Sequence, residues 1–345
     1  MTNKKVVNTN YAGAKGEKID FARFVEIAKE TIKDYLPDEY ENAIVDVQPC
    51  NKLNESYLGM TVKAQKNTVL PTLNLNMFYD TLQHFHYDLE KIMKKMAEIV
   101  QIPPMEVDMD LFSDYEKAKK CLFIRVTDAD RNQEILSNAP YTQVENLAIT
   151  YHIFLDFEDK REDIASALVT NEMMRRFNIS KDQLHQDAME NSPKLFPAKV
   201  ESVSELMKNM MRRNMRDAGI REEDIDQMMR EMYQETLTPL TIVTNEQIVN
   251  GASAIFYSGL MDQIGELLEG DYFIFPSSIN EMLVCRDTAG MTSDELKCMV
   301  MEINNTNVQP EERLTNEVYH YDTKCRVFEK ASVFEARMSK LDIFS

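Results

Sequence analysis

The residues of this sequence that could do chemistry are concentrated in one polar loop, residues 276–281, with the sequence PSSINE. Ser277 or Ser278 could act as a nucleophile if a histidine and a carboxylate lie within hydrogen-bonding reach. The nearest histidine along the chain is His320, so the fold would have to supply that contact. Hydroxyl and amide side chains also commonly satisfy backbone groups in tight turns. We therefore expect a hairpin turn first and a ligand- or partner-binding loop second, with no catalytic residue.

Five polar residues form the candidate binding set. They are Ser277, Ser278, Asn280, Glu281 and Asn304. The first four belong to the PSSINE loop, and the fifth lies towards the end of a predicted helix. Asparagine is a common capping residue at such positions, so a structural role is the stronger expectation for Asn304.

Acidic residues elsewhere do not complete a metal-binding pattern. Asp128, Asp130 and Asn132 have the spacing of the first ligands of an EF-hand calcium loop. The sixth position is Gln133 and the twelfth is Ala139, where such a loop needs a glycine and a bidentate carboxylate. The sequence also contains no HExxH, P-loop or dinucleotide-binding glycine motif. We therefore predict neither a metal site nor a cofactor.

The chain is strongly acidic, with a formal net charge of −19 over 345 residues. This charge argues against nucleic acid and anionic membranes as partners, because both favour basic protein surfaces. No stretch approaches the roughly 18 apolar residues of a membrane-spanning helix, and the first 20 residues contain no apolar signal segment. The five cysteines are scattered, which is typical of reduced thiols. These features predict a soluble cytoplasmic protein and leave its oligomeric state open.

Composition and hydrophobic pattern divide the chain into a tail and four segments. We predict a flexible tail at 1–19, an N-terminal α+β unit at 20–112, a middle α+β unit at 113–200, a Met-rich helical hairpin at 201–237 and a C-terminal α+β unit at 238–345. The mixture of helices and short, mainly antiparallel strands predicts an α+β fold of two or three packed units. Asp20, Ser180 and Thr292 are the predicted N-caps of three helices.

The segment 201–237 contains seven methionines, several of them at helical spacing. They are Met207, Met210, Met211, Met215, Met228, Met229 and Met232. Methionine packs well in irregular cores and also forms adaptable docking surfaces. We expect these side chains to face the core of a helical pair, with docking of a protein partner as the second interpretation.

The clearest local order lies in residues 239–286. The predicted elements are strands at 240–244 and 252–257, a helix at 260–268 and a hairpin formed by 271–275 and 281–286. Asn250-Gly251 is a strong turn signal between the first two strands. The PSSINE loop is the turn of the final hairpin.

Several stretches of the sequence resemble, in the same order along the chain, the conserved stretches of one protein family. They are PTLNLNMFYD (71–80), APYTQVENLAITY (139–151), AMENSPKLFP (188–197), IVTNEQIVNGAS (242–253), YFIFPSSINE (272–281) and LTNEVYHYD (314–322). They resemble the uncharacterised domain of unknown function family 5688, seen mainly in anaerobic Gram-positive bacteria. The resemblance implies no established activity. The family pattern has a histidine where this chain has Asn280, and an amide cannot act as a general base.

Two classes of function remain open at this point. The leading hypothesis is a non-catalytic cytosolic binding or regulatory module, because the sequence contains no assembled catalytic set. The alternative is a hydrolase or metal-dependent enzyme with its site near the PSSINE loop. That alternative requires Ser277, Ser278 or Glu281 to meet His320, Asp322 or another acid in the fold.

Overall fold

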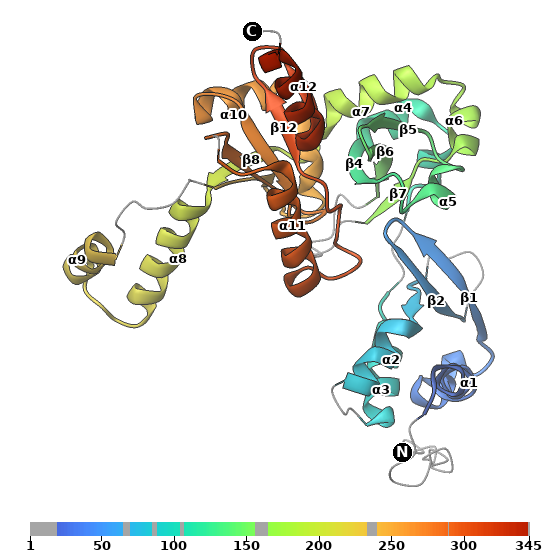
Figure 1. Cartoon of the computed structure of the whole chain (residues 1–345). Helices are drawn as coiled ribbons and strands as arrows, with labels where there is room; N and C mark the ends of the chain where they lie inside the picture. Colours follow the sequence, from blue (N-terminus) through green and yellow to red (C-terminus); the bar gives the residue numbers. More distant parts are fainter. Residues whose placement is uncertain are drawn as a thin grey trace. The chain divides into compact units, whose positions relative to one another are not determined.

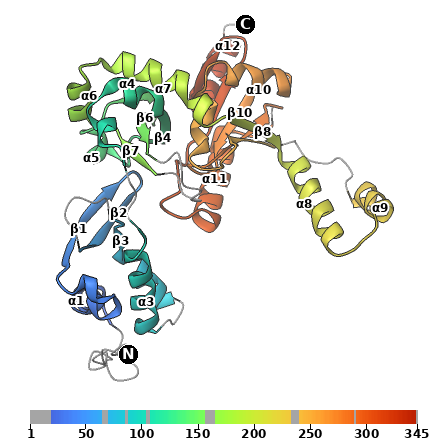
Figure 2. The same ribbon diagram turned by 180° about the vertical axis from the view of Figure 1, so that it is seen from behind.

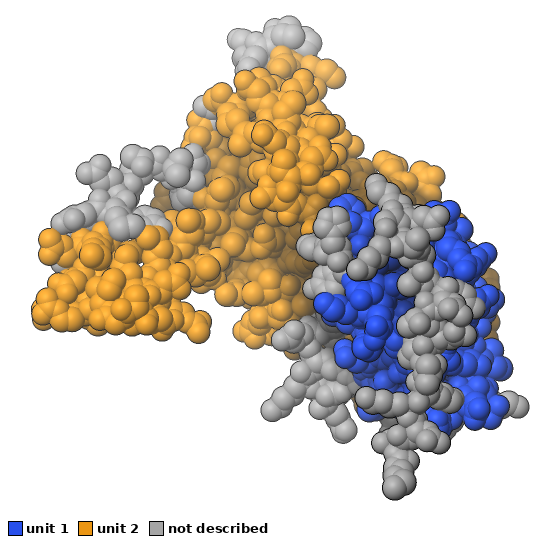
Figure 3. All heavy atoms as spheres, turned by 90° about the horizontal axis from the view of Figure 1, so that it is seen from below, with its two compact units in different colours: residues 1–108 blue, residues 109–345 orange. Residues whose placement is uncertain are grey.

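The chain forms two compact units, Met1–Asp108 and Met109–Ser345. Their helices and strands are drawn in Figures 1 and 2, and Figure 3 colours the two units separately. The computed structural model describes residues 19–64, 70–84, 88–103, 107–155, 165–232, 240–288 and 290–343. The predicted tail at 1–19 lies outside these residues except for Ile19.

The first unit packs helices against a three-stranded antiparallel sheet. Its strands are β1 (Ile44–Lys52), β2 (Glu55–Lys63) and β3 (Leu73–Asn74), adjacent in that order. Its helices are α1 (Phe21–Thr31), α2 (Leu75–His84) and α3 (Leu89–Val100), with the short 3-10 helices η2 (Ile32–Tyr35) and η3 (Asp38–Tyr40). Asp20 accepts a hydrogen bond from Arg23 N at 2.8 Å, which confirms its predicted capping role. Fully buried Phe24, Ile92 and Met96 belong to the core of this unit.

The second unit begins with a four-stranded antiparallel sheet. Its strands are β4 (Leu122–Asp128), β5 (Tyr141–Val144), β6 (Leu147–Phe154) and β7 (Ser166–Leu168); β6 pairs with the other three. The helices of this part are η4 (Met109–Phe112), α4 (Tyr115–Ala118), η5 (Lys119–Cys121), α5 (Gln133–Leu136), α6 (Asn171–Phe177) and α7 (Lys181–Leu195). Helix α7 packs beside β4 and β6, as Figure 1 shows. Ser180 accepts a hydrogen bond from Gln183 N at 3.1 Å and so caps α7 as predicted.

A six-stranded antiparallel sheet completes the second unit. Its strand order is β13-β12-β10-β11-β9-β8. The strands are β8 (Ala198–Ser202), β9 (Thr241–Asn245), β10 (Tyr272–Pro276), β11 (Met282–Arg286), β12 (Tyr319–Asp322) and β13 (Val327–Lys330). The helices are α8 (Val203–Asp217), α9 (Glu222–Met232), η6 (Gly251–Phe256), α10 (Leu260–Leu268), α11 (Ser293–Asn307) and α12 (Ala331–Ile343). Helices and antiparallel strands throughout the described residues confirm the predicted α+β fold class.

One hydrophobic core serves both sheets of the second unit. It contains Leu122, Tyr151 and Leu184 from the predicted middle segment, and Val243 and Tyr272 from the predicted C-terminal segment. All five side chains are fully buried. The segments predicted as separate units at 113–200 and 238–345 therefore share a core.

The local signals around residues 239–286 predict this region well, with one exception. The hairpin of β10 and β11, the helix α10 and the capping box of Thr292 with Glu295 are all confirmed. The predicted strand at 252–257 is wrong, because Gly251–Phe256 forms the 3-10 helix η6. Residues 251–255 are all buried. A short segment that is buried on every side has no pattern of apolar and polar residues by which a strand could be told from a helix.

Helices α8 and α9 carry the methionine-rich sequence and contact each other. Ile225 and Met229 are buried, whereas Met207, Met210 and Met228 are 53%, 57% and 42% exposed. Docking of a protein partner on these exposed methionines stays a prediction.

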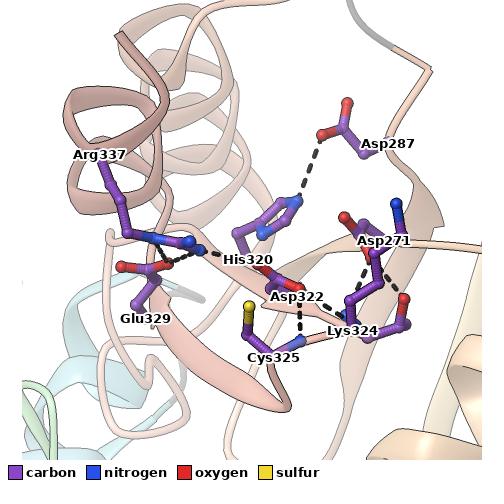
Figure 4. A network of polar contacts seen from close by, with 9 residues as sticks. Asp271, Asp287, His320, Asp322, Lys324, Cys325, Glu329 and Arg337 are labelled. Atoms are coloured by element: carbon purple, nitrogen blue, oxygen red, sulfur yellow. Dashed lines mark hydrogen bonds and ion pairs between the residues drawn. The ribbon is translucent and has the colours of Figure 1, made fainter. Parts of the chain in front are cut away.

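Helix α12 is tied to the β12–β13 hairpin by charged side chains, as Figure 4 shows. Arg337 Nη2 donates to Asp322 Oδ2 at 2.9 Å and to Glu329 Oε1 at 2.7 Å. Asp322 Oδ1 also accepts a hydrogen bond from Cys325 N at 2.8 Å. The Cys325 hydrogen bond, followed by Arg337, outweighs burial and lowers the pKa of Asp322 to about 2. The hairpin turn and α12 are therefore held through one carboxylate.

Replacing this carboxylate should weaken the fold in a pH-dependent way. Asp322→Asn should lower the free energy of unfolding at pH 7 by on the order of 2 kcal/mol, because the amide cannot pair with Arg337 as an ion. The folded pKa lies below the unfolded value, so this contribution is present above about pH 4 and is lost as the pH falls towards 2. Urea unfolding at pH 7 and pH 3 measures the difference. The exposed Asp217→Asn is the matched control, and a deficit of equal size at both pH values would contradict the assignment.

Candidate functional site

The predicted binding loop is a hairpin turn whose polar groups bond to one another. Ser277 Oγ donates to Glu281 Oε1 at 3.1 Å, and Asn280 N donates to Ser278 Oγ at 3.0 Å. Ser278 N donates to Glu281 O at 3.2 Å. The structure thus brings these four predicted residues together at the turn between β10 and β11. Their role in binding a ligand or partner stays a prediction.

Asn280 connects this turn to two other loops. Its Oδ1 accepts a hydrogen bond from Asn250 N at 2.9 Å, and its Nδ2 donates to Glu312 Oε1 at 3.2 Å. Ile279 N donates to Glu312 O at 2.8 Å. An amide side chain can donate and accept at once, which suits it to a junction of this kind. The turn therefore helps to position the irregular segment 308–313.

His320 lies far along the sheet from this turn. It pairs in register with Phe273, four residues before Ser277, which corresponds to a separation of about 13 Å at roughly 3.3 Å per residue. Its Nε2 donates to Asp287 Oδ2 at 3.2 Å, and its ring stacks on Phe334 with centroids 3.5 Å apart (Figure 4 shows the contact with Asp287). Burial lowers the pKa of His320, and the Asp287 carboxylate opposes that shift. A contact of Ser277 or Ser278 with His320, one of the contacts that would support the hydrolase alternative, is therefore not formed.

A polar pocket of about 530 Å³ is lined by residues of α11, the end of β4 and the segment that precedes β12. Its lining residues are Asp128, Asp130, Arg131, Asn146, Lys297, Met301, Asn305, Pro310, Arg313, Thr315, Asn316, Glu317 and Lys330. Four of these side chains are basic and three are acidic. The lining therefore has a formal excess of one positive charge (four minus three), within a chain whose net charge is −19.

Asn146 fixes one side of the polar pocket. Its Nδ2 donates to Thr315 Oγ1 at 3.1 Å, and its Oδ1 accepts a hydrogen bond from Tyr319 OH at 2.8 Å. Burial, and then the carboxylates of Asp128 and Glu317, raise the pKa of Tyr319. The Tyr319 hydroxyl therefore stays protonated and remains a donor to Asn146 at ordinary pH.

The segment 308–313 forms a second side of the pocket. Arg131, in the turn after β4, donates from Nη1 to Arg313 O at 2.9 Å and from Nη2 to Pro310 O at 3.2 Å. The same segment accepts hydrogen bonds from the PSSINE turn. An irregular piece of backbone is thus fixed by contacts from two distant parts of the sequence.

Lys297 and Glu317 line both the polar pocket and a smaller hollow of about 170 Å³. Lys297 Nζ lies 2.6 Å from Glu317 Oε1. The other residues that line the smaller hollow are Ser293, Asp294, Val318, Ala331 and Ser332. The ion pair therefore lies where the two hollows adjoin.

Asn304, the fifth predicted residue, supports the polar pocket without lining it. Its side chain is almost completely buried, at 1% exposure. Its Nδ2 donates to Thr315 O at 3.0 Å and to Asn316 Oδ1 at 2.8 Å. Asn304 therefore connects α11 to the backbone that lines the pocket.

The polar pocket offers charges and hydrogen-bonding groups suited to recognition. Its lining, as far as the structure describes it, contains no histidine or cysteine. Within the described ranges, no group of three His, Cys, Asp or Glu side chains is placed to hold a metal ion. Burial raises the pKa of Cys285, which lies outside the pocket, to about 11, so that thiol is protonated at neutral pH.

The sequence profile of a family of unknown function, DUF5688, matches residues 21–323. The chain belongs to this family. The range shared with DUF5688 contains every residue of the polar pocket except Lys330. No curated protein and no solved structure matches this DUF5688 chain. In the part of the chain that the structure describes, no helix is both long enough and apolar enough to cross a membrane.

Sequence reasoning missed the polar pocket of this DUF5688 member. Asp128 and Asp130 form an incomplete calcium-loop pattern, and nothing in that pattern indicates that Arg131 contacts Arg313, 182 residues later. One sequence signal could have indicated the pocket: the polar residues that follow directly after the buried strand β4. Residues in that position lie at the edge of a sheet, where binding sites are common. A second signal was the stretch 314–322, which carries part of the family resemblance and supplies Thr315 and Glu317.

The loop junction at Asn280 should be sensitive to added volume. Gly251→Ala should reduce the free energy of unfolding by about 2–3 kcal/mol, because overpacking forces backbone shifts. A Cβ at Gly251 would lie 2.1 Å from Thr244 Oγ1 and 2.6 Å from Asn280 O. Gly290→Ala is the control, since its Cβ would meet nothing within 4 Å. Chemical unfolding followed by circular dichroism measures both, and equal effects would show that the junction is not tightly packed.

Proposed function

We propose that this chain is a non-catalytic binding protein whose polar pocket holds a small polar ligand. The observation that carries the proposal is the pocket itself: about 530 Å³, with charged and amide side chains from three distant segments facing one space. Small-molecule sites commonly occupy about 300–1,000 Å³. The size of this pocket fits that range, and its polar lining favours a polar occupant.

The way the pocket is built supports a binding role. Asn146, Asn280 and Asn304 each use their side-chain amides to hold segments that line the pocket. Rigid positioning of polar groups lowers the entropic cost of binding a ligand. The described lining contains no histidine or cysteine that could serve as a base or thiol nucleophile, which favours recognition over catalysis.

We also propose a cytoplasmic location in a bacterial cell. The resemblance of the sequence to a bacterial family supports the source. All five cysteines are free thiols, which suits a reducing compartment.

A thermal-shift screen of the full chain tests the binding function. The panel should contain amino acids, dicarboxylates, sugar phosphates, nucleosides and polyols. A compound present at about 100 times its Kd stabilises the folded state by about 2.7 kcal/mol, which raises the Tm by several degrees. We expect at least one compound class to do so.

Two tryptophan substitutions on α11 localise the binding. Asn305→Trp places a bulky side chain at an exposed position that lines the pocket, and should abolish the shift. Ile303→Trp is the matched control, because Ile303 is 45% exposed on the same helix and does not line the pocket. Absence of any stabilising compound, or an equal shift in both variants, would show the proposed function to be wrong.

A further inference from the structure

We propose that the ligand of the polar pocket carries an anionic group, a carboxylate or a phosphate, bound by Arg313 with Lys330 as a second positive charge. This inference rests on the proposed function and names the chemical class of the ligand. The basis is that two basic side chains of the pocket, Arg313 and Lys330, have donor groups or a charge without a partner among the described residues.

Arg313 presents an oriented and unused pair of donor groups to the pocket. Its Nε donates to Val308 O at 3.0 Å, which holds the guanidinium plane in place. Within the described residues, neither Nη1 nor Nη2 of Arg313 has a hydrogen-bond or ion-pair partner. The side chain is half-buried and lines the pocket. The two Nη groups of a fixed guanidinium match the two oxygens of a carboxylate or phosphate.

Lys330 adds a positive charge that the chain does not neutralise. It ends β13, pairs in register with Tyr319, and is half-buried in the lining of the same pocket. No carboxylate among the described residues lies within ion-pair distance of its Nζ. An anionic ligand in the pocket would supply the counter-charge that Lys330 lacks.

The other two basic residues of the pocket are already engaged. Lys297 is paired with Glu317 at 2.6 Å. Arg131 donates to the carbonyl oxygens of Arg313 and Pro310 and so fixes the segment that carries the Arg313 side chain. Arg313 and Lys330 are therefore the cations left for a ligand.

The acidic side of the pocket adds a second requirement on the ligand. Asp128 is 7% exposed, and its carboxylate accepts a hydrogen bond from Arg131 N at 2.9 Å and lies 3.4 Å from Asn146 Nδ2. An anion placed against Asp128 would be repelled, whereas a hydroxyl or ammonium group would donate to it. The ligand is thus expected to carry hydrogen-bond donors away from its anionic end.

Anion binding to the full chain tests the inference. Inorganic phosphate and acetate, each compared with sodium chloride at equal ionic strength, are titrated while the Tm is recorded. We expect at least one anion to raise the Tm of the wild-type protein. Stabilisation by phosphate alone indicates a phosphorylated ligand, and stabilisation by acetate alone or by both indicates that a carboxylate suffices.

Substitutions identify the groups that bind the anion. Arg313→Ala should weaken binding at least roughly tenfold, and Lys330→Ala by a smaller factor. Arg313→Lys keeps the charge without the paired donors and should fall between wild type and Arg313→Ala. Arg213→Ala and Lys29→Ala remove equal charges at exposed positions outside the pocket and should change nothing. Circular dichroism of each variant checks that it is folded.

The outcomes separate this inference from the proposed function. The inference is overturned if neither anion stabilises the wild-type protein, or if Arg313→Ala and Arg313→Lys respond as the wild type does. If a neutral or cationic compound still binds, and Asn305→Trp abolishes that binding, the pocket is a ligand site with a different chemistry. If no compound of any class binds, both the proposed function and the inference fail.

Discussion

Irregular segments between helices and strands need hydrogen bonds to hold them in place, and here three asparagine amides supply several of these bonds. Asn146 links the start of β6 to Thr315 and Tyr319. Asn280 links the β10–β11 turn to the segment 308–313, and Asn304 links α11 to Thr315 and Asn316. Asn146 and Asn280 each donate and accept through one side chain, and Asn304 donates to two residues, so each amide joins segments that share no regular structure. These three residues and Arg131 hold the segment before β12, which lines the polar pocket, from different elements.

Much of the fold could be predicted from the sequence because its determinants are local. Thr292 and Glu295 are three residues apart and form a reciprocal capping box, so their pattern alone marks the start of α11. The β10–β11 hairpin is equally local, since two apolar runs flank a turn. The segment 252–257 was wrongly predicted as a strand. Its residues are almost all buried, so the sequence lacks the alternation of apolar and polar residues that distinguishes a strand from a helix.

The site could not be predicted in the same way. Sequence reasoning singled out Asn280 and Asn304 for the type of position they occupy, and the structure shows both in contact with segments that line the polar pocket. The groups that face the pocket come from residues 128 to 330 and meet only through the shared core of the two sheets. The contact of Arg131 with Arg313 cannot be predicted from the spacing or periodicity of residues in the sequence, because the packing of the two sheets sets its geometry. Long-range polar sites therefore become visible only once the fold is known.

The ion pair of Lys297 and Glu317 has a consequence for how much room a ligand has. Their side chains are 40% and 24% exposed, and partly exposed ion pairs typically contribute about 1 kcal/mol or less. The two side chains can therefore be separated at modest cost, and both of them line the smaller hollow as well as the larger one. A ligand long enough to extend from the larger hollow into the smaller one would have to compete with this ion pair, and a short ligand would leave it intact.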